Sequence, residues 1–463
     1  MKTIFRYIAG GLLATAAVMP ATAQELRTSY FMETSNYRHQ MNPALLDAPY
    51  VGVLFSNVNV GTTGNVGLSN FIYKLEGNPK YDLTTFMSPT VSAEQFLGDL
   101  KDKNRVNVSL NMNILSVGFK MLKGVSLFEM NLRSNTNANL PKELFEFIKT
   151  TGAKEHYQLG DLGVRTQNYL EFALGHSRNI NDRLRIGAKF KYLLGAAYAD
   201  LSADNLDITM NGDMWRINGA AKAKAAVLKS TLYEDRSKPH PTIPNRYRVD
   251  DLDDIEFGLP GSGFAFDFGA TYKVTDDLTL SAAITDLGLI SWKDAHRASS
   301  QGEWDFDGFD NIYAGDNKTE DNEIGDQFEA LGDDLEDMFA IYNDGDGKVK
   351  QGLATTINIG AEYTLPVYRK LNFGFLYTSR LNGIYSWHQG MFSANVHPVK
   401  WFELAVSTGF SSTGVTFGSV MSLKAKHFNF YLGADSFLGK VSKEFIPLHN
   451  MNANVNLGMT FPL

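Results

Sequence analysis

The chain has 463 residues, a formal net charge of −8, 41 glycines, 12% aromatic residues and no cysteine. Outside the N-terminal region no stretch has the ~18 consecutive apolar residues of a membrane-spanning helix, which excludes a helical membrane protein. The lack of cysteine excludes a lipid-anchored lipoprotein and a disulfide framework. The sequence also lacks the basic stripe with interleaved aromatic residues that would indicate a nucleic-acid partner.

Residues 1–23 have the pattern of a secretory signal peptide. Lys2 and Arg6 precede an apolar stretch, and Ala21-Thr22-Ala23 is a cleavage site before Gln24. A short N-terminal anchor helix is the alternative. Residues 24–49 follow without any strand pattern, and they contain Asn42-Pro43-Ala44. Two interpretations stay open for this segment: a disordered lead-in, or a plug folded into the mouth of a barrel.

Beyond residue 49, apolar and polar residues alternate in run after run, which predicts β-strands. In the last run, Val455, Leu457 and Met459 share one face, whereas uncharged Asn454 and Asn456 lie on the other. An apolar face opposite an uncharged polar face, over ~10 residues, is typical of a strand between lipid and a barrel lumen. The strand-like runs are 50–60, 106–119, 125–134, 164–174, 183–198, 264–274, 278–290, 353–365, 371–381, 391–396, 402–410, 415–423, 428–437 and 450–463.

The connections between these runs alternate between short turns and long segments. Short turns on the periplasmic side and long loops outside are typical of outer-membrane proteins. We therefore predict an all-β fold, a transmembrane antiparallel β-barrel over residues 50–463, with about 14 strands, or about 16 if the hairpin at 205–228 enters the membrane. Residues 140–150 are predicted to form a short helix and residues 233–260 a loop. An aromatic girdle would place Trp292, Trp387 and Trp401 at the membrane boundaries.

Residues 292–350 are predicted to form an acidic external insert, because 16 acidic residues and one lysine lie between Glu303 and Asp346. Tyr342 to Gly347 is similar to a calcium loop, but the first and twelfth ligand positions of an EF-hand would be Tyr342 and Leu353 instead of carboxylates. A looser calcium site stays open as a weak alternative to a solvated loop. Its candidates are Asp344 and Asp346, with Asp305, Asp307 and Asp310.

Five cations are predicted to form a lumen-facing basic cluster: Arg165, Arg183, Arg185, Lys189 and Lys191. Their apolar neighbours in sequence occupy the lipid side, where a cation at the midplane would cost about 2–4 kcal/mol. Compensating charge is expected from Glu171, from the plug acids Glu25, Glu33 and Asp47, or from an anionic head group. The alternative is that some of the five meet lipopolysaccharide phosphates at the interface.

No catalytic motif is visible in the sequence. It contains no nucleophile elbow, zinc-binding HExxH or P-loop. Ser393 with His388 or His397 is a weak candidate for a serine–histidine pair. We therefore expect no enzyme activity, no cofactor and no metal.

The signal peptide, Asn42-Pro43-Ala44, the barrel size and the run from Leu278 to Gly288 resemble the FadL-like fatty-acid transporter superfamily. Over nearly the whole mature chain, the sequence is more closely similar to an uncharacterised outer-membrane β-barrel family of Bacteroides-like bacteria, defined by a domain of unknown function. The acidic insert is outside the transporter pattern.

The resemblance implies passive transport or binding of a hydrophobic or amphiphilic small molecule in the outer membrane of a Gram-negative cell. Other relatives imply a structural or secretion-machine partner barrel with a sealed lumen, and a soluble periplasmic β-protein is a second alternative. The expected partners are outer-membrane lipid and lipopolysaccharide, a hydrophobic ligand, and a protein at the external loops, with no nucleic acid.

Overall fold

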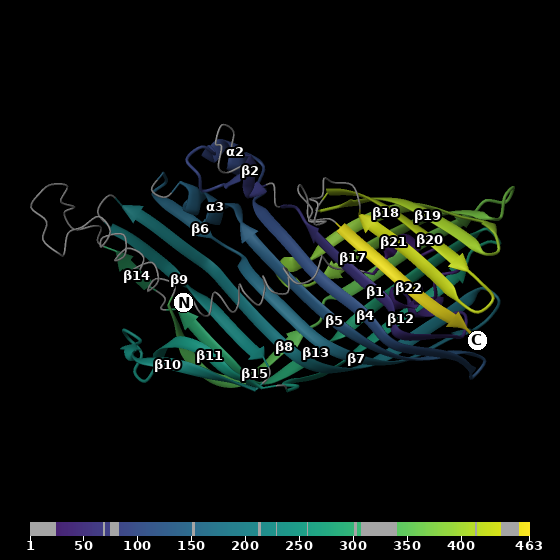
Figure 1. Cartoon of the computed structure of the whole chain (residues 1–463), viewed down its shortest axis with the longest axis horizontal. Coiled ribbons are helices and arrows are strands. Elements are labelled where there is room, and N and C mark those ends of the chain that lie inside the picture. The colour runs from purple at the N-terminus through teal and green to yellow at the C-terminus, as the bar shows by residue number, and fades with distance from the viewer. Residues whose placement is uncertain are drawn as a thin grey trace, which may run out of the picture.

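The computed structural model describes residues 25–67, 70–74, 83–150, 153–211, 214–227, 229–256, 258–300, 303–306, 340–412, 414–436 and 453–463. Fourteen antiparallel strands form a closed barrel, which confirms the predicted fold class (Figure 1). In ring order they are β1 (Tyr50–Gly64), β4 (Lys103–Met121), β5 (Gly124–Pro141), β7 (Leu162–Asn179), β8 (Leu184–Asn211), β12 (Gly261–Lys273), β13 (Leu278–Ser300), β16 (Thr355–Thr364), β17 (Leu371–Leu381), β18 (Trp387–Val399), β19 (Phe402–Ser411), β20 (Gly414–Lys424), β21 (Asn429–Ser436) and β22 (Ala453–Pro462).

The barrel closes where β1 pairs with β4 on one side and with β22 on the other. Tyr50 lies opposite Pro462 in the β1–β22 ladder. The β1 register shifts on both sides around Leu54 and Phe55, which have φ values of 52° and 64°. These two side chains are 83% and 55% exposed, so the bulge presents apolar groups on the outer wall.

The wall is apolar outside and polar inside. On β22, Val455 and Leu457 are 51% and 46% exposed, whereas Asn454 and Asn456 are 5% and 2% exposed. Large apolar residues are exposed in the same way on other strands, among them Phe190, Phe264, Phe268, Phe375, Phe392 and Phe417. This is the reverse of a water-soluble protein and matches a barrel surrounded by lipid. No helix in the described ranges is long and apolar enough to cross a membrane.

Part of the same hydrogen-bonded sheet extends beyond the ring at the end opposite the short turns, on the left of Figure 1. The far ends of β8 and β13 continue into it. Its other strands are β6 (His156–Leu159), β9 (Met214–Val227), β10 (Lys229–Pro239), β11 (Tyr247–Glu256), β14 (Glu303–Phe306) and β15 (Ile341–Gly352). We call these strands, with the ends of β8 and β13, the outer sheet. β9 pairs with the far parts of β8 and β13 and with β14, whereas β8 pairs directly with β12 in the ring, so the ring has fourteen strands and not sixteen.

The predicted loop over residues 233–260 is wrong, because β10 and β11 pair with each other there. Their residues are mainly polar and charged, so a criterion based on a lipid-facing apolar side did not detect them. The first long connection contains β2 (Ile72–Lys74), β3 (Leu83–Thr85) and α2 (Ala93–Gly98), and the next contains α3 (Lys142–Lys149), the predicted short helix. Phe96 and Phe145 pack together between α2 and α3.

Two of the three tryptophans are not in a lipid-facing girdle. Trp292 is 0% exposed and Trp387 is 7% exposed, whereas Trp401 is 59% exposed. Trp292 stacks on Tyr198 at 5.3 Å, and Arg27 lies 4.9 Å from the ring centroid of Trp387. The girdle prediction was therefore wrong for Trp292 and Trp387. β13 continues past Trp292 to Ser300, and Trp387, the first residue of β18, lies on the inner face beside Arg27.

Candidate functional site

Residues 25–49, here called the luminal segment, lie inside the barrel. They form three short 3₁₀ helices, η1 (Arg27–Ser29), η2 (Asn36–Gln40) and η3 (Pro43–Leu45). Their hydrogen-bond partners come from strands around the whole ring: Asn113 (β4), Glu129 (β5), Ser177 (β7), Ser281 (β13), Asn358 (β16), Glu403 (β19) and Asp435 (β21). One segment can reach all these strands only from within the ring.

The Asn42-Pro43-Ala44 motif forms the part of the segment closest to β8 and β12. The Asn42 side chain accepts a hydrogen bond from the Ala44 backbone N–H at 3.0 Å, which caps η3. A Cβ added at Gly187 would lie 2.3 Å from the Pro43 carbonyl carbon, and one at Gly269 would lie 2.0 Å from Asn42 Oδ1. Glycine at both wall positions therefore allows the motif to approach the backbone of the barrel.

Lys189 and Lys191 of the basic cluster point inward and meet buried acids. The Lys189 Nζ atom lies 2.9 Å from Glu129 Oε2 and 2.8 Å from His39 Nδ1. The Lys191 Nζ atom lies 2.8 Å from Asp267 and 2.6 Å from Asp286. These acids project from β5, β12 and β13. They supply compensation that we expected from Glu171, from the acids of the luminal segment or from an anionic head group.

The three arginines of the cluster differ in position. Arg165 forms an ion pair with Asp200 at 3.2 Å. Arg185 donates to the Leu46 carbonyl oxygen of the luminal segment at 2.5 Å and to Ser177 Oγ at 2.9 Å. Arg183 is exposed at the turn between β7 and β8, so its predicted luminal position is incorrect. It lies one residue before β8 begins, where strand alternation does not yet hold.

The acids of the luminal segment pair elsewhere. Glu25 accepts from Arg133 at 3.0 Å, and Arg133 also lies 3.4 Å from Glu171. Asp47 pairs with Arg38 within the segment itself. Sequence reasoning missed Glu129, Asp286 and Arg133 as parts of this network. The available signal was their position within predicted strands whose alternate residues are apolar.

The lumen around the luminal segment is tightly filled. Two cavities beside Glu25 and Arg380 have volumes of about 10 and 20 Å³, and each has room for about one water molecule. Toward the outer end, Trp292 packs with Tyr198, Ile290 and Val349 in a buried apolar cluster. The luminal segment and this apolar cluster therefore occupy two different regions of the barrel, and the residues of the cluster come from β7, β8, β12, β13 and the neighbouring β9 and β15.

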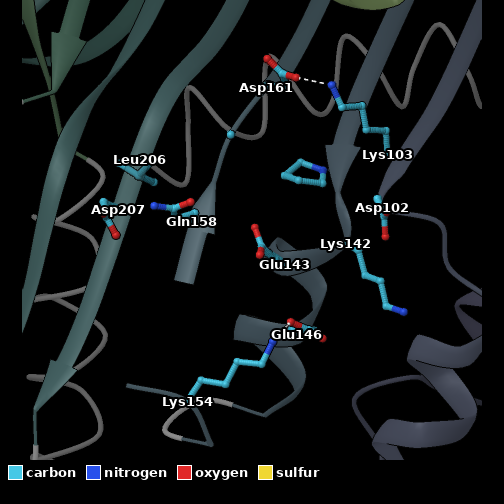
Figure 2. A pocket seen from close by; sticks show the side chains of 12 residues that line it. Asp102, Lys103, Lys142, Glu143, Glu146, Lys154, Gln158, Asp161, Leu206 and Asp207 are labelled. Atoms are coloured by element: carbon cyan, nitrogen blue, oxygen red, sulfur yellow. Dashed lines mark hydrogen bonds and ion pairs between the residues drawn. The ribbon is translucent and has the colours of Figure 1, made fainter. Parts of the chain in front are cut away.

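A larger cavity of about 660 Å³ lies at the outer end, between the start of β4, α3, β6 and the far part of β8 (Figure 2). Ion pairs join Lys103 to Asp161 and Lys154 to Glu146, both at 2.5 Å. The hydrogen bond to Glu146 raises the pKa of the Lys154 ammonium. Figure 2 shows Glu143 among these groups, on the cavity side of α3. Such a lining suits a polar ligand better than a hydrocarbon.

The weaker candidates from the sequence are separated from one another. Asp344 pairs with Arg246 at 2.5 Å and Asp346 with His296 at 2.7 Å. Within the described residues no group of three acids or histidines is arranged to hold a metal, and Asp307 and Asp310 lie outside those residues. Ser393 is buried, whereas His388 is exposed and contacts Tyr377, so they do not form the serine–histidine pair.

Comparison with known proteins gives a family match and fold similarities. A model described as Family of unknown function (DUF5723) matches residues 43–435. No curated protein matches the chain. The P. putida toluene transporter TodX is 8% identical, with 92% of this chain and 93% of that chain covered and a TM-score of 0.39. The Ralstonia pickettii toluene transporter TbuX is 9% identical, with 92% of this chain and 93% of that chain covered and a TM-score of 0.41. A Pseudomonas aeruginosa FadL homologue is 9% identical, with 96% of this chain and 97% of that chain covered and a TM-score of 0.38.

Proposed function

The chain belongs to the Family of unknown function (DUF5723), and we propose that it is an outer-membrane barrel, closed at rest by its luminal segment, that conducts a small amphiphilic solute when the segment moves. The observation that carries this proposal is that a continuous segment fills a polar lumen through noncovalent contacts alone. Thr28, Tyr30 and Met41 are hydrogen-bonded to three different strands, and the chain has no cysteine to fix them covalently. Such contacts can be exchanged for water when the segment is displaced.

The apolar outer wall and the placement of all long connections at one end support an outer-membrane location. The signal peptide over residues 1–23 lies outside the described residues and stays a prediction, as does the Gram-negative, Bacteroides-like source. We expect the protein in the detergent-soluble outer-membrane fraction, with heat-modifiable migration on a denaturing gel. Recovery in osmotic-shock fluid would show instead a soluble periplasmic protein.

The class of solute follows from the inner wall. Inward-facing side chains are mainly amides, hydroxyls and paired charges, among them Asn57, Asn59, Asn111, Asn131, Asn358, Asn395 and Asn456. A purely hydrocarbon solute would gain little binding energy from this polar surface. It would also have to displace the water that fills the lumen when the luminal segment moves out. We therefore propose an amphiphilic solute with a polar head group, rather than a simple hydrocarbon.

Liposome flux tests the proposal. We expect wild-type protein to pass little solute, because the luminal segment and the Trp292 cluster close the barrel. A variant lacking residues 25–49, exported with the same residues 1–24, is expected to pass small polar solutes faster when the apolar cluster is also opened by Trp292→Ala. Heat-modifiable migration reports that each barrel is folded. A folded double variant as impermeable as wild type would exclude transport through the lumen.

A second candidate is a sealed barrel that serves as a platform for another protein. It is favoured by the outer sheet, in which β9, β10, β11, β14 and β15 extend beyond the fourteen-strand ring. A stoichiometric partner captured by wild type and lost when residues 229–256 are replaced by a short turn would support this role. If the double variant is also impermeable, that result would favour a role in protein assembly over a role in transport.

A further inference from the structure

Three polar side chains in the outer sheet form a continuous hydrogen-bonded chain. Asp346 Oδ1 lies 2.7 Å from His296 Nδ1, and His296 Nε2 lies 3.1 Å from Ser230 Oγ. The residues belong to β15, β13 and β10. The order carboxylate, imidazole, hydroxyl and both distances are those by which a serine nucleophile is activated in unrelated hydrolases.

Each residue is positioned by the way its strand pairs. His296 lies directly opposite Asp346 in the β13–β15 ladder, so adjacent strands fix the carboxylate beside the ring. The β10–β11 ladder shifts register between Lys229 and Thr231, so Ser230 has no partner in that ladder. Breaks of this kind redirect a side chain, and here the Ser230 hydroxyl turns toward His296.

The contact with Asp346 fixes one proton of the His296 ring. A carboxylate can only accept, so the proton between Asp346 and His296 belongs to Nδ1, which leaves Nε2 of the neutral ring free to accept from Ser230 Oγ–H. Nε2 also lies 3.1 Å from the Ser230 carbonyl oxygen. Once Nε2 takes a proton it can donate to that oxygen while Asp346 balances its charge. His296 therefore has hydrogen-bonding partners in both the neutral and the protonated state, as a general base requires.

We propose that Ser230, His296 and Asp346 form a nucleophilic site that hydrolyses small carboxylic esters on the outer side of the membrane. Ser230 Oγ attacks the ester carbonyl carbon as its proton passes to His296 Nε2. The bond from carbon to the leaving oxygen breaks, and Nε2–H protonates the departing alkoxide. Water then attacks the acyl-serine, passes a proton to Nε2, releases the acid and restores the Ser230 hydroxyl. This activity is independent of whether the barrel conducts.

The surroundings limit the class of ester. In the outer sheet Asp346 is exposed and Ser230 is half-buried, whereas His296 is buried, so a substrate would reach Ser230 from the water-exposed surface beside Asp346. Among the described contacts, no donor is directed at the place where the oxyanion would form, and such a donor is worth about 10²–10³-fold in rate. We therefore expect esters with a good leaving group, such as aryl esters, to react, and amides to be inert.

The test uses full-length protein in detergent, a fluorophosphonate probe and p-nitrophenyl acetate. Wild type is expected to be labelled at Ser230 and to hydrolyse the ester. Ser230→Ala should abolish labelling, and His296→Gln should slow it by about 10²–10⁴-fold, the usual contribution of a general base. Ser237→Ala is the matched control, because Ser237 is an exposed serine of β10 whose hydroxyl contacts Asp235 and no histidine.

Heat-modifiable migration shows which variants are folded. If Ser230→Ala does not fold, mass spectrometry of the probe adduct on wild type decides, with the adduct expected on Ser230. The inference is overturned if wild type is labelled no faster than Ser230→Ala, if the adduct lies on another residue, or if Ser237→Ala loses labelling equally. Hydrolysis that survives in folded His296→Gln would likewise remove the histidine from the mechanism.

Discussion

At the scale of single residues, Lys191 is the cation on which the inner charge network depends. It contacts Asp267 and Asp286 and lies 3.7 Å from Glu171. Lys191→Met leaves these acids buried without their shared partner, which should lower the free energy of unfolding by about 3–5 kcal/mol. The measurement is the denaturant midpoint of the refolded barrel. Lys426→Met, at an exposed turn, is the control, and equal midpoints for the two variants would contradict the network's role.

His240 makes the turn after β10 sensitive to pH. Its Nδ1 accepts from the backbone N–H groups of Thr242 and Ile243, each at 3.1 Å. Burial, and then nearby Arg246, lowers the pKa of His240 below its ordinary value of about 6.5. The unfolded turn therefore binds the proton more readily than the folded one. Its stabilising contribution is complete above the ordinary pKa and is lost as pH falls toward the lowered value.

Amide hydrogen exchange measures this effect. We expect protection factors of Thr242 and Ile243 to fall as the pH decreases below the ordinary histidine pKa of about 6.5, because Nδ1 is then protonated and can no longer accept. In His240→Asn the side-chain oxygen accepts at every pH, so protection should not vary over that range. Protection that falls equally in both proteins would assign the pH dependence to another group.

The alternation of apolar and polar residues predicts which side chains face the lumen, but not which of these side chains contact one another. Lys191 on β8 reaches Asp267 on β12, and these strands are neighbours in the ring although the outer-sheet hairpins separate them in sequence. Asp267 could be assigned to the polar face from its own run. Its register against Lys191 depends on the ladder between β8 and β12, which no local pattern specifies. The Ser230–His296–Asp346 site was hidden for the same reason.

At the scale of elements, the fit of η3 against β8 predicts how the barrel can be opened. Gly187→Val would place side-chain carbons where the Pro43 carbonyl now lies, since even a Cβ would approach it to 2.3 Å. Overpacking of this kind costs about 1–3 kcal/mol, and we expect the luminal segment to be displaced while the wall stays intact. Single-channel recordings should show more frequent conducting events for Gly187→Val combined with Trp292→Ala than for Trp292→Ala alone.

Gly390→Val is the control for this prediction. A Cβ at Gly390 would have its nearest neighbour, in Phe375, at 3.7 Å, which is an ordinary contact. The added side chain therefore tests the effect of valine on a barrel strand without touching the luminal segment. Identical recordings for Gly187→Val and Gly390→Val, each combined with Trp292→Ala, would mean that η3 does not limit conductance.

For the whole molecule, the apolar outer face and polar inner face predict that the effect of a charged substitution on stability depends strongly on where the residue lies. Leu457→Arg, on the outer face of β22, should destabilise the barrel in lipid vesicles by about 2–4 kcal/mol if Leu457 lies near the midplane. Leu122→Arg, at the turn between β4 and β5 where Leu122 is 68% exposed, should cost about 0–1 kcal/mol. Equal unfolding midpoints would mean that β22 does not face lipid.

The ring size could be predicted from sequence because lipid imposes the same alternation and length on every strand that crosses it. The outer sheet is free of that constraint, so β10 and β11 were assigned to a loop. The inner position of Trp292 was missed because the predicted run ended at residue 290, whereas β13 continues to Ser300. That of Trp387 was missed because an aromatic residue at a strand end suits either the interface or the lumen. The local sequence pattern therefore predicts the strands of the barrel wall, whereas the packing inside the lumen depends on contacts between residues that are distant in sequence.

The position of the luminal segment constrains the order in which the chain can be assembled. Thr28 is 407 positions from Asp435, and Thr34 is 369 positions from Glu403, yet each pair is hydrogen-bonded. The hydrogen bonds of these first residues therefore cannot form until the last strands of the chain have been synthesised, and the same holds for the pairing of β1 with β22. Contacts of such separation form slowly. During that interval the unpaired early strands depend on an insertion factor or a chaperone to avoid aggregation.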